Sequence, residues 1–104
     1  MAPLVRACRE RGEAIEPTVC LTGQHRELLA PVIDYFGIRA DVQLDLMTPD
    51  QSLAQLTARC LERIDEVIVA CGCDFLVAQG DTTTAMAAAL AAFYRRTPFV
   101  HVEA

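Results

Sequence analysis

The sequence predicts an α/β fold, arranged as a partial doubly wound parallel sheet of the Rossmann-like type. Helical and strand-like patterns alternate over all 104 residues in the order α-β-α-β-α-β-α-β. The expected strands are short and apolar, and glycines stand where several expected helices end. No strand pattern precedes the first helix, so we expect the sheet to lack its first strand.

Four elements are expected in the first half of the chain: helices over residues 3–11 and 24–36, and strands over residues 17–21 and 42–46. Gly12 and Gly37 directly follow the two helical patterns, in the position typical of a helix stop. Pro31 falls within the second helix and predicts a bend there. The first half therefore contains two helix–strand repeats.

The second half is expected to contain helices over residues 52–70 and 82–96, and strands that begin at Phe75 and Phe99. The first of these strands leads to Asp81 and the second to Glu103. A strand, a helix and a strand at this spacing form a βαβ unit with parallel strands. Both carboxylates are therefore expected at the carboxyl edge of the sheet, where open α/β sheets bind ligands. Two acids there indicate proton chemistry on a bound molecule.

Composition narrows the classes of function. With 53% hydrophobic and 22% charged residues, the chain is globular and forms one domain at most. The net charge of −5 argues against a nucleic-acid partner or an anionic membrane surface. No stretch approaches the roughly 20 apolar residues of a membrane span, and no secretory signal stands at the start, so we expect a cytoplasmic protein with reduced thiols. Cys71 and Cys73 lack the spacing of a metal site, and we predict no metal.

Asp81 has two interpretations that weigh equally on the residues alone. As an N-cap it would accept the free amide hydrogens of the next helix, and as a catalytic group it would act on a ligand. Both roles are compatible if Thr82 supplies the cap. The amino end of that helix also attracts phosphate groups, so Thr82 and Thr83 are candidate substrate-binding residues.

Four other polar residues have a structural explanation that competes with function. Glu103 ends an apolar strand, and composition alone favours a solvent-facing residue there, because unpaired burial would be costly. Gln24 and His25 lie at another strand-to-helix turn, where capping and solvent exposure are the simpler explanation. His101, inside the last strand, is equally compatible with a hydrogen-bonded sheet residue.

Five motifs together resemble the non-hydrolysing UDP-N-acetylglucosamine 2-epimerase family, in the same order and spacing. They are Met1-Ala-Pro-Leu-Val5, Thr22-Gly-Gln-His-Arg-Glu27, Gly80-Asp-Thr-Thr-Thr84, Leu90-Ala-Ala-Phe-Tyr94 and His101-Val-Glu-Ala104. The resemblance covers the whole chain but only about the first third of a family member. It implies that residues 1–104 are a partial N-terminal Rossmann-like domain of a two-domain, glycosyltransferase-B-like fold whose C-terminal domain is absent.

The resemblance also implies a chemistry. Family members interconvert UDP-N-acetylglucosamine and UDP-N-acetylmannosamine by eliminating UDP and adding it back, without a cofactor. They supply building blocks for the synthesis of surface polysaccharides and are commonly homodimers. The aligned Asp81 and Glu103 would be the catalytic acids or bases, and Gln24 and His25 would contribute to an allosteric nucleotide site.

Two hypotheses of different class follow. The first is an epimerase, present here as a fragment that we expect to be inactive alone. The second is a stand-alone sugar-nucleotide-binding or interaction module that needs a second half. A hydrolysing enzyme on the same fold is less well supported, because the five motifs agree with the non-hydrolysing family.

Overall fold

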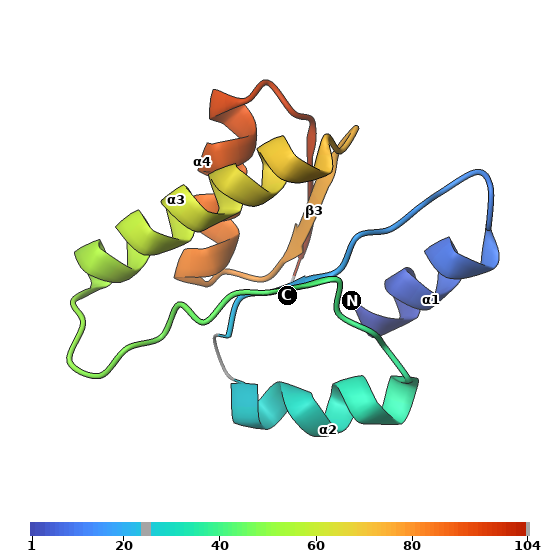
Figure 1. Ribbon diagram of the computed structural model, residues 1–104, viewed down its shortest axis with the longest axis horizontal. Coiled ribbons are helices and arrows are strands. Elements are labelled where there is room, and N and C mark those ends of the chain that lie inside the picture. Colours follow the sequence, from blue (N-terminus) through green and yellow to red (C-terminus); the bar gives the residue numbers. More distant parts are fainter. Residues whose placement is uncertain (24–25, 104) are drawn as a thin grey trace. The chain divides into compact units, whose positions relative to one another are not determined.

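The structure, a computed structural model, describes residues 1–23 and 26–103, apart from the side chain of Arg26 (Figure 1). The chain divides into two compact units, Met1–Asp45 and Leu46–Ala104. Helices and strands alternate through both units in the predicted order, so the α/β class is confirmed. Among the helices described, none combines the length and apolar character that crossing a membrane requires.

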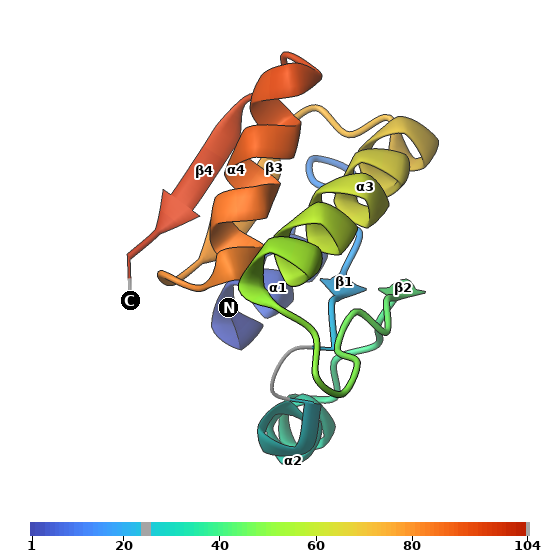
Figure 2. The same cartoon turned by 90° about the vertical axis from the view of Figure 1, so that its left-hand side faces the viewer.

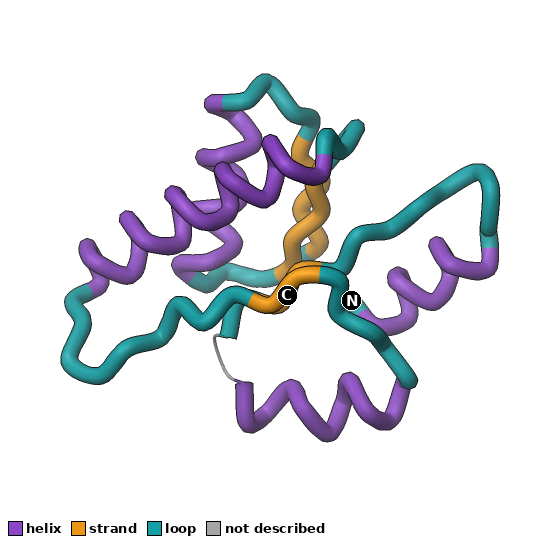
Figure 3. The backbone as a smooth tube through the Cα atoms, in the orientation of Figure 1, coloured by secondary structure: helices purple, strands orange, loops and turns teal. Residues whose placement is uncertain are grey.

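The first unit contains helix α1 (Ala2–Glu10), strand β1 (Cys20–Leu21), helix α2 (Arg26–Phe36) and strand β2 (Val42–Gln43). The two strands pair in parallel, with Cys20 opposite Val42 (Figure 3). Gly12 and Gly37 have φ angles of 53° and 62° just beyond the two helices, which confirms both predicted helix stops. Pro31 lies inside α2, and the bend expected there stays a prediction.

Both strands of the first unit are shorter than the apolar patterns over residues 17–21 and 42–46 predict. The reason is that a strand extends only as far as the backbone groups of a neighbouring strand are there to pair with it. Beside the paired residues, the Val19 amide donates to the carboxylate of Asp41 at 2.7 Å, so a side chain takes the place of a ladder bond. An apolar run marks burial, whereas strand length depends on how far a second strand runs alongside.

The second unit contains helix α3 (Leu53–Cys71), strand β3 (Leu76–Gln79), helix α4 (Thr83–Tyr94) and strand β4 (Phe99–Val102). A reciprocal pair of bonds starts α3. The Ser52 hydroxyl accepts from the Gln55 amide at 3.1 Å, and the Gln55 side chain accepts from the Ser52 amide at 2.8 Å. The helix ends at Gly72, whose φ of 61° is left-handed. The predicted helix over residues 52–70 is therefore confirmed to within one residue at each end.

The βαβ unit is also confirmed. β3 and β4 form a parallel pair in which Leu76 lies opposite Phe99 and Ala78 lies opposite His101. α4 packs on this pair, and α3 packs against α4 (Figure 2). The buried residues of α4 are all alanines, and such small side chains allow the neighbouring elements to approach closely. Four larger or polarizable side chains of α3 are buried: Leu56, Cys60, Ile64 and Ile68.

An ion pair joins α3 to the end of α4. Arg95 donates through two guanidinium nitrogens to the two carboxylate oxygens of Asp65, at 2.6 and 2.7 Å. This forked geometry is the strong form of an arginine–carboxylate contact. The hydrogen bond from Arg95 is the main reason that the pKa of Asp65 is lowered.

Candidate functional site

The candidate site begins where β3 ends, at Gly80. The Gly80 amide donates to the carbonyl of Val102 at 3.0 Å, so the β3–β4 ladder extends to this residue. Its φ of +92° lies in a region that L-amino acids rarely adopt, and glycine meets this requirement because it has no Cβ. The turn at Gly80 delivers Asp81 to the edge of the sheet.

Thr82 is the N-cap of α4. It has extended backbone angles, φ −79° and ψ 165°, and its hydroxyl accepts from the Ala85 amide at 3.3 Å. The capping explanation of Asp81 is therefore wrong, because the neighbouring threonine already fills that role. Within the described residues, no group donates a hydrogen bond to the Asp81 carboxylate, which is exposed. This carboxylate is available to a ligand.

Glu103 directly follows β4 and is exposed, as its solvent-facing explanation expects. The bond between Gly80 and Val102 joins the residues that immediately precede Asp81 and Glu103. Because neighbouring strands of a sheet lie about 4.8 Å apart, the two acidic residues leave the sheet from adjacent points. The structure thus brings together, at the backbone, the two residues that the sequence placed at one edge.

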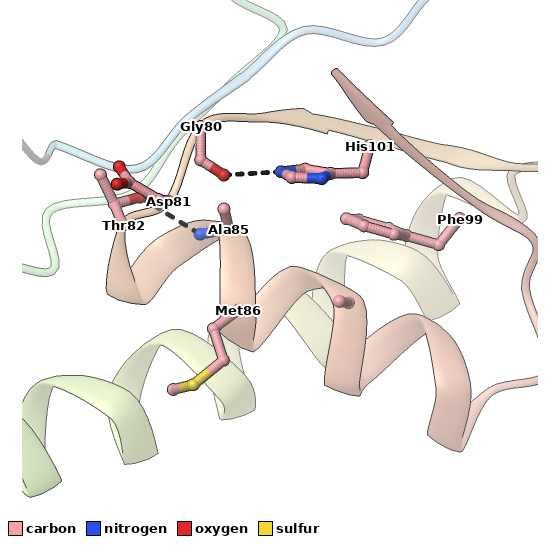
Figure 4. Close-up of a pocket in the computed structure, with 8 residues that line it drawn as sticks. Gly80, Asp81, Thr82, Ala85, Met86, Phe99 and His101 are labelled. Carbon is pink, nitrogen blue, oxygen red and sulfur yellow. Dashed lines mark hydrogen bonds between the residues drawn. The ribbon is translucent and has the colours of Figure 1, made fainter. Parts of the chain in front are cut away.

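A shallow cavity of about 280 Å³ lies beside Asp81. Its lining comes from the Gly80 turn, α4 and β4: Gly80, Asp81, Thr82, Ala85, Met86, Ala89, Phe99 and His101 (Figure 4). Ligand pockets usually occupy about 300–1,000 Å³, so this cavity is at the lower limit for a small molecule. It has room for one sugar-sized group, and a sugar nucleotide would need further walls.

His101 has a defined place in this cavity. Its Nε2 lies 2.6 Å from the carbonyl oxygen of Gly80, and its ring stacks on Phe99 with centroids 6.2 Å apart and an angle of 15° between planes. The interpretation of His101 as a hydrogen-bonded sheet residue is confirmed. The bond goes to the turn before Asp81, which the sequence did not indicate.

No sequence pattern indicated the apolar wall of the cavity, which consists of Ala85, Met86, Ala89 and Phe99. Part of the signal was present. Phe99 and His101 are two apart in a strand and so share a face, and Ala85 and Ala89 are four apart in a helix and also share a face. Which strand face meets which helix face depends on packing, and no local pattern contains that information.

Three predicted site residues remain: Thr83, Gln24 and His25. Thr83, in the first turn of α4, is half-buried beside the cap. Gln24 and His25 lie outside the described residues. No group of three or more histidine, cysteine or acidic side chains that could hold a metal ion occurs in the part of the chain that the structure describes.

The cysteines of the second unit, Cys60, Cys71 and Cys73, do not line this cavity. The pKa of the Cys73 thiol is raised, mainly by burial and then by the neighbouring Cys71. Cys60 is fully buried in α3 and lies 4.0 Å from the hydroxyl of Thr84, and burial raises its pKa. A raised pKa keeps a thiol protonated and unreactive, so neither residue has the character of a nucleophile.

The arrangement favours acid–base chemistry on an anionic ligand. Two exposed carboxylates leave adjacent strands, and beside them the first-turn amides and the dipole of α4 favour negative charge. The Thr82 hydroxyl uses one lone pair in the cap and keeps its O–H for donation to a ligand oxygen. A bound molecule would therefore meet both proton acceptors and hydrogen-bond donors.

Comparison with known proteins shows the family of this chain. The sequence profile of the UDP-N-acetylglucosamine 2-epimerase family matches residues 6–104. The whole chain is 46% identical to the UDP-N-acetylglucosamine 2-epimerase of Yersinia pestis and 44% identical to that of Escherichia coli K12. The chain spans 27% of the length of each of these relatives.

Solved structures give the same result. The chain superposes along its full length on the putative UDP-N-acetylglucosamine 2-epimerase of Listeria monocytogenes, with a TM-score of 0.92 and 47% identity, covering 27% of that chain. It also superposes on the Neisseria meningitidis UDP-GlcNAc 2-epimerase, solved with UDP-GlcNAc bound, with a TM-score of 0.91 and 40% identity, covering 28% of that chain. These are enzymes of the Rossmann-like, glycosyltransferase-B-like class. The chain therefore belongs to the UDP-N-acetylglucosamine 2-epimerase family.

Proposed function

We propose that this chain supplies part of the catalytic cleft of an enzyme that interconverts UDP-N-acetylglucosamine and UDP-N-acetylmannosamine. The observation that carries the proposal is the pairing of β3 with β4, which starts Asp81 and Glu103 from adjacent points beside the amino end of α4. Epimerisation at C2 requires removal of a weakly acidic proton and stabilisation of a departing diphosphate. Two carboxylates and a helix N-terminus are suited to these two tasks.

The proposed roles follow from position. One of the two carboxylates removes the C2 proton, and the electron pair left on C2 expels UDP from C1 to form an unsaturated sugar. Addition of UDP back to C1, with proton return to the other face of C2, gives the epimer. Thr82 and Thr83 hold substrate oxygens at the start of α4, where the helix dipole offsets negative charge.

The chain is proposed to act as the N-terminal Rossmann-like part of a longer, two-domain protein. The cavity of about 280 Å³ is too small to enclose a sugar nucleotide, and the chain spans about a quarter of its relatives. A second domain completes the nucleotide site, and the isolated chain is inactive. We further propose that the full-length protein is a cytoplasmic homodimer that uses no cofactor.

The test is made in a full-length epimerase that contains this chain. We expect Asp81→Asn and Glu103→Gln each to lower kcat at least about a hundredfold, the size typical of losing an acid–base group. Asp74→Asn is the matched control, because Asp74 is an exposed acid at the opposite end of β3. Turnover near the wild-type rate in either site variant removes that residue from the mechanism.

Two further measurements test proton abstraction at C2 and the class of reaction. Turnover in deuterium oxide should place deuterium at C2 of the product, since the abstracted proton exchanges with solvent. Proton NMR of the product should show UDP-N-acetylmannosamine for epimerisation, whereas free N-acetylmannosamine with UDP would identify a hydrolase. Product without deuterium at C2 would contradict proton abstraction by either carboxylate.

A further inference from the structure

We propose that His101 is a positioning residue, which holds the peptide group between Gly80 and Asp81 so that the Asp81 carboxylate faces the substrate. This inference rests on the proposed role of Asp81. It starts from one contact that spans 21 residues, the 2.6 Å approach of His101 Nε2 to the Gly80 carbonyl oxygen. That oxygen belongs to the same rigid, planar peptide as the Asp81 amide.

The two polar backbone groups of Gly80 are both bonded to β4. Its amide donates to the Val102 carbonyl at 3.0 Å, and its carbonyl lies against the His101 ring. Gly80 has a φ of +92°, and glycine is the residue with the widest backbone freedom. The Gly80 amide belongs to the preceding peptide group, so the bond to His101 is the one that ties the Gly80 end of the Gly80–Asp81 peptide to β4.

The chemistry of the contact assigns a proton. A carbonyl oxygen can only accept, so His101 must carry its proton on Nε2 and donate it to Gly80. The ring is supported from a second direction, because it stacks on Phe99 at an angle of 15°. Figure 4 shows the imidazole pointing toward the Gly80 carbonyl, with Asp81 beyond Gly80 from the ring.

His101 thus acts on the substrate through Asp81. A small error in the placement of a reacting group can lower a rate up to about a hundredfold, and this loss appears in the transition state more than in binding. The inference therefore predicts an effect on kcat with little effect on KM. It also predicts that any side chain able to donate from the Nε2 position will restore activity.

The test uses two replacements of His101 in the full-length epimerase. His101→Phe keeps a planar ring that can stack on Phe99 but removes the donor, and we expect kcat to fall roughly ten- to a hundredfold with KM within about twofold. His101→Gln places an amide N–H near the Nε2 position, and we expect it to recover most of that loss. Val100→Ala, on the adjacent and exposed residue of β4, is the control and should leave both constants unchanged.

A double-mutant cycle tests whether His101 works through Asp81. In the Asp81→Asn background, His101→Phe should cause no further loss of kcat, because there is no carboxylate left to position. An additional loss as large as in the wild type would overturn the inference, and so would wild-type activity of His101→Phe. Full activity of Asp81→Asn alone would instead refute the proposed catalytic role of Asp81, so the two failures are distinguishable.

Nitrogen-15 NMR of the histidine ring supplies a readout that does not depend on turnover or on any variant. The inference requires the proton on Nε2 of His101. A bare Nε2 at neutral pH would overturn it even if the His101 variants fail to fold.

Discussion

Replacement of the cap residue of α4 tests which of two neighbouring side chains starts the helix. Thr82→Ala removes the hydroxyl that accepts from the Ala85 amide, while Thr82→Ser keeps it. Asp81→Ala removes the neighbouring carboxylate, which makes no cap bond in the structure. If Asp81 is free for chemistry, the capping contribution to stability should come from Thr82 and not from Asp81.

The expected magnitude follows from the geometry. An N-cap replaced by alanine costs about 0.5–2 kcal/mol. The Thr82–Ala85 bond is long, at 3.3 Å, which favours the lower part of that range. Ala85 is only 7% exposed, so water cannot easily take over its amide, which favours the upper part. We expect Thr82→Ala to lower the free energy of unfolding by about 1 kcal/mol, and Thr82→Ser to change it by much less.

The loss of stability caused by Asp81→Ala should differ from that of Thr82→Ala in its dependence on salt. An acid near a helix N-terminus contributes about 0.3–1 kcal/mol through the helix dipole, and salt screens this contribution. In urea denaturation at about 1 M salt, where the Debye length is about 3 Å, the loss from Asp81→Ala should nearly vanish. The loss from Thr82→Ala should persist.

The refuting result is the reverse pattern. A loss of about 1 kcal/mol for Asp81→Ala that survives high salt, together with an unchanged Thr82→Ala, would make Asp81 the cap. The carboxylate would then be occupied, and its availability for a ligand would lose its physical basis.

Two further predictions concern stability. Asp65→Asn should lower the midpoint of thermal unfolding at pH 7, because it breaks the forked ion pair with Arg95, whereas Glu66→Gln, in a looser pair at 3.6 Å, should have little effect. The pKa of Asp65 is lowered in the folded state, so the stabilisation by this ion pair is present above about pH 4 and is lost as the pH falls through the lowered pKa. The decrease in the unfolding midpoint caused by Asp65→Asn should therefore become smaller in acid. A decrease that stays constant from pH 7 to pH 2 would contradict this prediction. Ile64→Ala should cost about 2–5 kcal/mol in urea denaturation, since Ile64 is 6% exposed, while Val69→Ala, at 59% exposed on the same helix, should cost little; equal losses would show that Ile64 is not a core residue.

Much of the candidate site could be predicted from local patterns. Apolar strands leading to Asp81 and Glu103, with one helix between them, were enough to place both acids at one edge, because a βαβ unit has parallel strands. The helix ends at Gly12 and Gly37 could also be predicted, because the position after a helix often has a left-handed backbone conformation, which favours glycine.

Other features depended on contacts between distant residues. The bond from His101 to Gly80 requires the β3–β4 register, in which Ala78 lies opposite His101. The alternating pattern of β4 gave no indication of this partner. Strand lengths in the first unit were overestimated for a similar reason, because an apolar run continues beyond the point where a second strand lies alongside.

The sequence by itself determined the α/β class, the order of the elements, the family and the edge at which two acidic residues leave the sheet. Each of these features depends on residues within one or two neighbouring elements. Only the tertiary structure decided that Thr82 rather than Asp81 caps α4, and that His101 faces the turn before Asp81. The physical reason is that aspartate and threonine are both good N-cap residues, so the local sequence does not choose between them. The sequence of a single strand likewise does not specify the hydrogen-bond partner of a histidine in it. Packing of β4 beside β3 under α4 selects one arrangement among those that the local sequence permits.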